Sequence, residues 1–208
     1  MGYHLITCLK DGTIANYFSE SLEGLCEFDG ITKDSIIYQA AKEWTPSVIG
    51  GHENYNVLTE DWFRAGIRAQ WKFVEDAKIA KLIPEKISQD KEAFQAYTSA
   101  ATSRIKRGDY LLRKKNIEVE VKCLTLYGGN YYLPYSDVKS HETMQKLSAS
   151  PVWFAIYQRI GDTPTPGSLH MVSVACILAQ NNKQVKYEKK SKCLVIPQSM
   201  TSQGFTGI

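Results

Sequence analysis

Alternation of charged and apolar side chains between residues 117 and 122 is the strongest constraint on the fold of this chain. The apolar members are Ile117, Val119 and Val121, and the charged members are Glu118, Glu120 and Lys122. Because successive side chains of a strand point to opposite faces, this order predicts a strand with one core face and one polar face. The three charged side chains then share the polar face.

A second strand is predicted just upstream, at residues 109–112, with residues 113–116 as the polar turn of a hairpin. This hairpin can bring Asp109 close to Glu120. Two carboxylates are hard oxygen ligands of the kind that hold Mg²⁺, with Mn²⁺ as a substitute. The amine of Lys122 lies near the same point, where it can orient a water or offset charge on a phosphate.

Asp109, ten intervening residues and the run Glu120-Val121-Lys122 resemble the motif of the PD-(D/E)xK nuclease superfamily. Gly108 stands where the motif has its nominal Pro. The resemblance implies a restriction endonuclease-like α/β fold, with a central mixed β-sheet flanked by helices. It also implies Asp109, Glu120 and the carbonyl of Val121 as metal ligands, and Lys122 as the assisting amine. Glu118 remains open as an additional ligand or a solvated residue.

The elements predicted around the motif resemble the α-β-β-β-α-β order of that family. Helical spacing of apolar residues and strand-forming runs support them. The predicted helices are 90–106 and 136–147, and the further strands are 124–127, 131–133, 151–157 and 169–179.

The first half of the chain carries less chemical information. Residues 3–9 and 13–18 predict a hairpin, and apolar spacing predicts a helix over 32–44. A longer helix is expected from Thr59 to Leu82, with Trp62 among its core residues. We therefore expect residues 1–58 to be an addition packed on the core, with hairpin and helix. The nuclease-like core would span 59–197, followed by a flexible tail at 198–208.

Positive charge is concentrated around the motif, although the net charge of the chain is only +3. The residues are Arg104, Lys106, Arg107, Arg113, Lys114 and Lys115. Six cations in this position can bind a nucleic-acid backbone. The alternative, a solvated helix end followed by a charged turn, explains them equally well.

Other features of the sequence exclude competing classes of site. Its five cysteines form no closely spaced pairs, and its four histidines lack the spacing of a metal pair. No apolar run reaches transmembrane length, so we expect a cytoplasmic protein without a membrane partner. A homodimer is a further expectation, since many double-strand cutters pair two active sites.

The predicted function is that of a Mg²⁺-dependent DNA endonuclease, restriction-type or in another DNA-processing role. RNA is not excluded as a substrate. The alternative is a catalytically silent module on the same fold, binding nucleic acid or protein. A third hypothesis is an α/β domain without a nucleic-acid role, which would place Asp109 far from Lys122.

Overall fold

The computed structural model describes residues 3–8, 14–19, 38–41, 61–87, 104–180, 185–188 and 191–208. Its centre is a mixed β-sheet with the strand order β13-β10-β8-β6-β5-β4, and β9 pairs with β8 outside this path. The strands are β4 (Pro84–Lys86), β5 (Tyr110–Leu112), β6 (Ile117–Leu124), β8 (Val152–Ile160), β9 (Thr163–Pro164), β10 (His170–Ser173) and β13 (Ser202–Gln203). β6 and β8 are parallel, whereas the other pairs are antiparallel.

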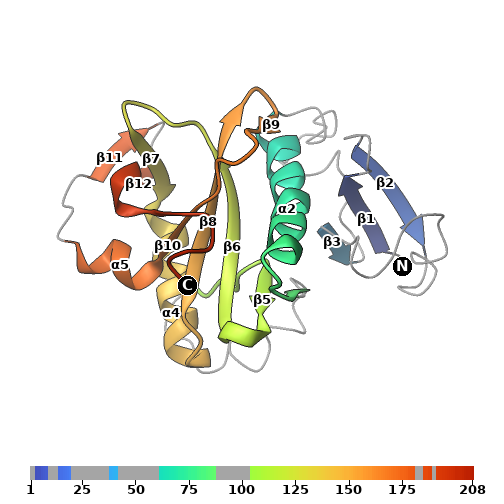
Figure 1. Cartoon of the computed structure of the whole chain (residues 1–208), viewed down its shortest axis with the longest axis horizontal. Helices are drawn as coiled ribbons and strands as arrows, with labels where there is room; N and C mark the ends of the chain where they lie inside the picture. Colours follow the sequence, from blue (N-terminus) through green and yellow to red (C-terminus); the bar gives the residue numbers. More distant parts are fainter. Residues whose placement is uncertain are drawn as a thin grey trace.

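Helices cover both faces of this sheet (Figure 1). Helix α2 (Asp61–Ile79) lies on one face, and α4 (Tyr135–Ser148) and α5 (Val174–Ala179) lie on the other. The predicted fold class, α/β with a central mixed sheet flanked by helices, is therefore confirmed.

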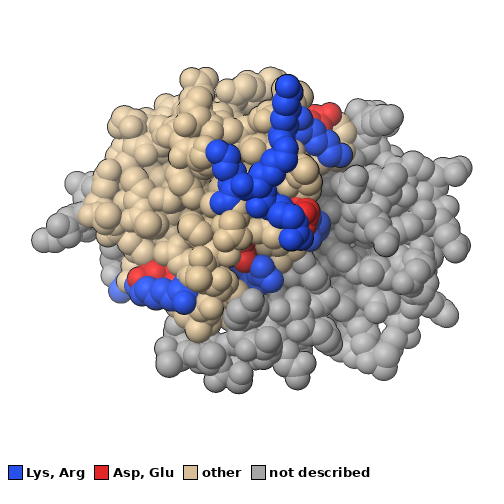
Figure 2. All heavy atoms as spheres, turned by 60° about the horizontal axis from the view of Figure 1, so that its bottom comes forward, with Lys and Arg blue, Asp and Glu red and all other residues tan. Residues whose placement is uncertain are grey.

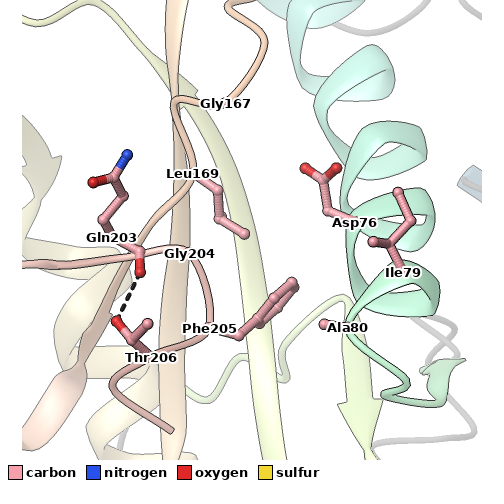
Figure 3. Close-up of a pocket in the computed structure, with 9 residues that line it drawn as sticks. All are labelled: Asp76, Ile79, Ala80, Gly167, Leu169, Gln203, Gly204, Phe205 and Thr206. Atoms are coloured by element: carbon pink, nitrogen blue, oxygen red, sulfur yellow. Dashed lines mark hydrogen bonds between the residues drawn. The ribbon is translucent and has the colours of Figure 1, made fainter.

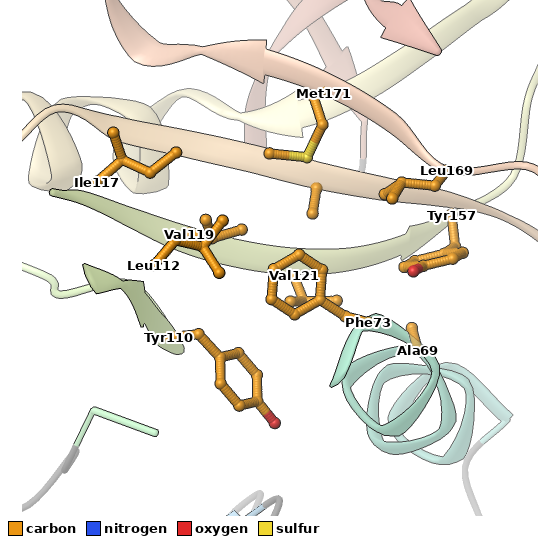
Figure 4. Close-up of a cluster of buried hydrophobic side chains, with 11 residues drawn as sticks. Ala69, Phe73, Tyr110, Leu112, Ile117, Val119, Val121, Tyr157, Leu169 and Met171 are labelled. Carbon is orange, nitrogen blue, oxygen red and sulfur yellow. The ribbon is translucent and has the colours of Figure 1, made fainter. Parts of the chain in front are cut away.

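Alternating side chains of the central strands build two separate cores. On the α2 side, Phe73 packs with Val119 and Val121 of β6 and with Tyr157 of β8 (Figure 4). On the α4 side, Phe154 and Ile156 of β8 pack with apolar residues of α4 and α5, including Val138 and Ile177. β8 is thus buried on both faces, as its continuous apolar run predicts.

Two smaller sheets lie beside the central one. In the first, β12 (Ser191–Pro197) pairs with both β11 (Val185–Glu188) and β7 (Asn130–Pro134). In the second, β1 (Tyr3–Cys8) pairs with β2 (Ile14–Ser19) and β3 (Tyr38–Ala41). β1 lies beside α2 in Figure 1.

Several predicted elements differ from those observed. The helix predicted over 32–44 is wrong at Tyr38–Ala41, which form β3 because they pair with β1; the rest of that range lies outside the described residues. The helix predicted over 90–106 is absent at 104–106, and its earlier residues and Thr59 are not described. Trp62, predicted to be in the core, is 53% exposed.

The strand predicted over 169–179 ends at Ser173, where α5 begins. The Ser173 hydroxyl accepts the N–H of Cys176 at 3.0 Å, which caps the helix. The segment 198–208, predicted to be a flexible tail, instead contains a 3-10 turn (Gln198–Met200) and β13. Phe205 and Ile208 pack against the α2-side core, which gives this end of the chain its apolar contacts.

In the part of the chain that the structure describes, no helix has the length and apolar character needed to cross a membrane.

Candidate active site

β6 presents two faces of different chemistry. Val119 and Val121 point into the core with α2. Glu118 and Glu120 leave the strand on the other side, where they are 1% and 3% exposed. The sequence predicts this polar face, but it does not predict that both glutamates on it are buried. Buried carboxylates need cations or N–H groups as partners, so the contacts of these glutamates define the site.

Glu118 supports the segment that precedes Asp109. Its Oε1 accepts a hydrogen bond from Arg107 Nη2 at 2.5 Å, and its Oε2 accepts the N–H of Gly108 at 3.0 Å. Both carboxylate oxygens are therefore used within the fold. Glu118 therefore anchors the chain beside the site.

Asp109 is held against β6 by two backbone contacts. Its N–H donates to the carbonyl of Val119, and its Oδ2 accepts the N–H of Val121, each at 2.8 Å. Lys86 of β4 lies 3.9 Å from its Oδ1. Burial raises the pKa of Asp109, and the negative charge of Glu120 raises it further. The hairpin thus brings these two carboxylates within electrostatic reach of each other.

Glu120 contacts two amines. Lys106 Nζ lies 2.6 Å and Lys122 Nζ 2.8 Å from Glu120 Oε1. Burial favours the neutral acid, but Lys122 and Lys106 together hold the pKa of Glu120 well below its usual range. Burial also favours a neutral Lys122, but Glu120 and Asp137 raise the pKa of that amine above its ordinary value. Glu120 is therefore ionised and Lys122 protonated at neutral pH.

Helix α4 adds two side chains that the sequence analysis did not select. Asp137 Oδ2 lies 3.1 Å from Lys122 Nζ and 3.5 Å from Lys106 Nζ. His141 is completely buried, and its Nε2 lies 3.6 Å from Glu120 Oε2. The available signal was their spacing, since residues four apart share one face of a helix. The sequence does not say which strand that face covers.

The donor atoms are compatible with a divalent cation. Glu120 Oε2 is buried and has no partner at hydrogen-bond distance among the described residues, since His141 Nε2 lies 3.6 Å away. A buried oxygen without a close partner is costly unless something binds it. The described residues contain no group of three His, Cys, Asp or Glu side chains placed to hold a metal. Mg²⁺ usually needs only one or two carboxylates, with water and substrate phosphate completing its coordination. The pair of Asp109 and Glu120 fits that requirement.

The six cations predicted to bind nucleic acid are in different environments. Lys106 and Arg107 contact the buried glutamates, whereas Arg104 is exposed. The other three form the turn between β5 and β6, a 3-10 turn (Arg113–Lys115) in which all three side chains are exposed.

The turn lies at the bottom of Figure 1. Figure 2 brings that side forward and shows Lys and Arg side chains gathered on the described part of the face. Some of these charges have partners within the chain: Arg113 Nε lies 2.5 Å from Glu85, and Lys115 Nζ donates to the carbonyl of Ile208 at 3.1 Å.

A pocket of about 670 Å³ lies elsewhere, between α2 and the C-terminal segment (Figure 3). Leu169 and Phe205 line it and also belong to the α2-side core. Asp76, the one carboxylate among the described residues that line the pocket, already contacts Lys72 at 2.9 Å and the hydroxyl of Tyr157 at 2.7 Å. The pocket is on the face of β6 opposite Glu120 and is separate from the charged cluster.

No protein-family model and no curated protein sequence matches this chain. Among solved structures, the chain is similar to Hjc of Archaeoglobus fulgidus, a Holliday junction resolvase from an archaeal hyperthermophile. The TM-score is 0.39 and the sequence identity 10%, and the match covers 65% of this chain and 90% of the resolvase.

Proposed function

We propose that this protein is a Mg²⁺-dependent nuclease of the PD-(D/E)xK type that cuts DNA internally. One observation carries the proposal: Asp109 accepts the N–H of Val121, the residue between Glu120 and Lys122, at 2.8 Å, and the amine of Lys122 is 2.8 Å from Glu120. Burying opposed charges in this way is costly for a fold, and functional sites are where such costs are commonly found.

Asp109, Glu120 and the carbonyl of Val121 would hold the metal, and Mn²⁺ would substitute for Mg²⁺. When bound, this ion supplies a Lewis acid for the phosphate and a more acidic water. Lys122 contributes a protonated amine that offsets negative charge on the phosphate as the bond breaks. Asp109 keeps its position through the N–H of Val121 and the carbonyl of Val119, so the backbone of β6 sets its place in the site.

The cations of the β5–β6 turn support a nucleic-acid substrate. Lys114 and Lys115 are exposed on the same hairpin that carries Asp109 and Glu120. Phosphate contacts made there would position a nucleic-acid backbone without reading its sequence.

A second function is favoured by one contact. Lys106 Nζ lies 2.6 Å from Glu120 Oε1, so an amine of the protein itself occupies part of the carboxylate that would bind the metal. A permanent ion pair at this position would make the chain a nucleic-acid-binding module without turnover.

Cleavage assays separate the two functions. Purified protein is incubated with supercoiled, linear and single-stranded DNA, and with RNA, in Mg²⁺, in Mn²⁺ or in EDTA. A nuclease converts supercoiled DNA to nicked or linear forms only when metal is present. Tight DNA binding without cleavage in either metal would instead support the non-catalytic module.

A further inference from the structure

Asp137, like Glu120, contacts the amines of both Lys106 and Lys122. Its Oδ2 lies 3.1 Å from Lys122 Nζ and 3.5 Å from Lys106 Nζ. Its side chain is 20% exposed and extends from the first turn of α4 towards β6. Burial favours the neutral acid, but Lys122 and Lys106 lower the pKa of Asp137 below its ordinary value.

The formal charges of the described side chains in this cluster balance without a metal. Three carboxylates, those of Asp109, Glu120 and Asp137, stand against the amines of Lys86, Lys106 and Lys122. A divalent cation bound to Glu120 would add two positive charges next to the amines of Lys106 and Lys122, which contact Glu120 Oε1. Like charges at this separation repel strongly when they are shielded from water.

If Glu120 were shared with a divalent cation, Asp137 would be the carboxylate that both amines still contact. An amine that lost Glu120 without another partner would be drawn towards solvent, away from the phosphate. A side chain that retains Lys122 near β6 keeps its ammonium group where the scissile bond would lie. Precise placement of this kind affects turnover more than substrate affinity.

We propose that Asp137 is a positioning residue, which holds the ammonium groups of Lys122 and Lys106 at the site when Glu120 is shared with a divalent cation. The proposal rests on the proposed nuclease function, which the experiment below tests separately. Asp137 acts through the lysines and is not itself a metal ligand.

Helix α4 offers a matched control. Glu142 lies on the same helix and also contacts two lysines, Lys139 and Lys146, with Lys146 Nζ 2.7 Å from its Oε1. Lys146 is exposed, and neither lysine contacts Glu120 or Asp137 in the described structure. Replacing Glu142 by Gln removes the same charge from α4 and leaves the site untouched.

The first measurement uses NMR of protein with ¹⁵N-labelled lysine, without metal or DNA. Ammonium signals of Lys106 and Lys122 are assigned from their loss in Lys106→Met and Lys122→Met. We expect Asp137→Asn to shift or broaden both signals, and Glu142→Gln to leave them unchanged. Should Asp137→Asn fail to fold, Asp137→Glu displaces the carboxylate by one methylene group and is expected to shift the same two signals. Unchanged signals in the folded variant would overturn the proposal.

The second measurement uses single-turnover DNA cleavage at saturating Mg²⁺. We expect Asp137→Asn to lower the single-turnover rate constant at saturating enzyme about 10- to 100-fold, the range typical of residues that support a metal site, with the enzyme concentration for half-maximal rate nearly unchanged. Asp137→Glu should recover part of the rate, and Glu142→Gln should cleave as the wild type does. A wild-type rate in Asp137→Asn would contradict the positioning role.

The two measurements also separate this proposal from the proposed function. If the wild type cleaves nothing in either metal, the nuclease proposal fails. Shifted ammonium signals would then still establish that Asp137 holds the two amines. Unchanged signals, together with the absence of cleavage, would overturn both the nuclease function and the positioning role of Asp137.

Discussion

Gly108 shows how one residue fixes the geometry of the candidate site. A Cβ placed on Gly108 would lie 2.9 Å from the backbone N, C and O atoms of Val119. Its N–H also donates to the buried carboxylate of Glu118 at 3.0 Å. The family that this sequence resembles has a nominal Pro here, but a proline would lose that hydrogen bond and meet the same backbone atoms. Close packing against β6 therefore accounts for the glycine.

Gly108→Ala is expected to lower the free energy of unfolding by about 1–3 kcal/mol, the usual cost of forcing an atom into a filled space. Urea denaturation of the two proteins measures this difference. Gly66→Ala is the control: Gly66 lies in α2 with open space at its Cβ, so alanine there should be neutral or stabilise by about 0.5–1 kcal/mol. Equal stability of Gly108→Ala and wild type would contradict the account of this position.

For single residues, the sequence predicted contacts between side chains of one strand better than contacts between side chains of different elements. The order of residues 117–122 placed Glu120 and Lys122 on one face, and they lie 2.8 Å apart. Asp137 and His141 reach the same point from α4, and only the packing of that helix brings them there. From its place on the polar face of the strand alone, Lys122→Ala is expected to leave folding intact. The structure instead predicts some loss of stability, since Glu120 and Asp137 would each lose a cation.

The β5–β6 hairpin is the element on which the proposal depends. Its strands pair in the register Tyr110 to Val119 and Leu112 to Ile117, which places Asp109 beside β6. The hairpin and its polar turn followed from local sequence, because alternation and a short polar segment determine them. The strand predicted over 169–179 failed because an apolar run does not distinguish a buried strand from a short buried helix. β3 was missed for a related reason: pairing with β1 overrides helical spacing.

The hairpin turn gives a prediction about DNA binding. Lys114→Ala combined with Lys115→Ala should weaken affinity for DNA and reduce the dependence of log K on log salt by about 1–2 units, since each phosphate contact contributes about 0.9. Fluorescence anisotropy in EDTA at several salt concentrations measures both quantities without cleavage. Lys146→Ala removes an exposed lysine of α4 and serves as the control. An unchanged salt dependence in the double variant would mean that the turn does not contact DNA.

At the level of the whole molecule, the two faces of the central sheet differ: one packs against α2 and the C-terminal segment, and the other carries the candidate site. α2 and the C-terminal segment pack on one side of the central sheet, and the pocket of about 670 Å³ lies there. The charged cluster lies on the other side, between β6 and α4. The sequence predicted the central sheet and its flanking helices, because strand and helix periods are local. The packing of residues 198–208 on the core was not predicted, since their polar and glycine-rich composition resembles that of a tail.

Single-turnover cleavage of supercoiled DNA in Mg²⁺ by wild type and Lys122→Met tests the proposed role of Lys122 in a metal-dependent nuclease. Methionine keeps the length of the side chain and removes its charge. We expect a rate about 100- to 1,000-fold lower in Lys122→Met, the usual cost of losing a group that stabilises transition-state charge. Lys146→Met should cleave at the wild-type rate, EDTA should stop every protein, and circular dichroism should show that the variants are folded. Metal-dependent cleavage by Lys122→Met at the wild-type rate would show that the Lys122 amine does not take part in cleavage.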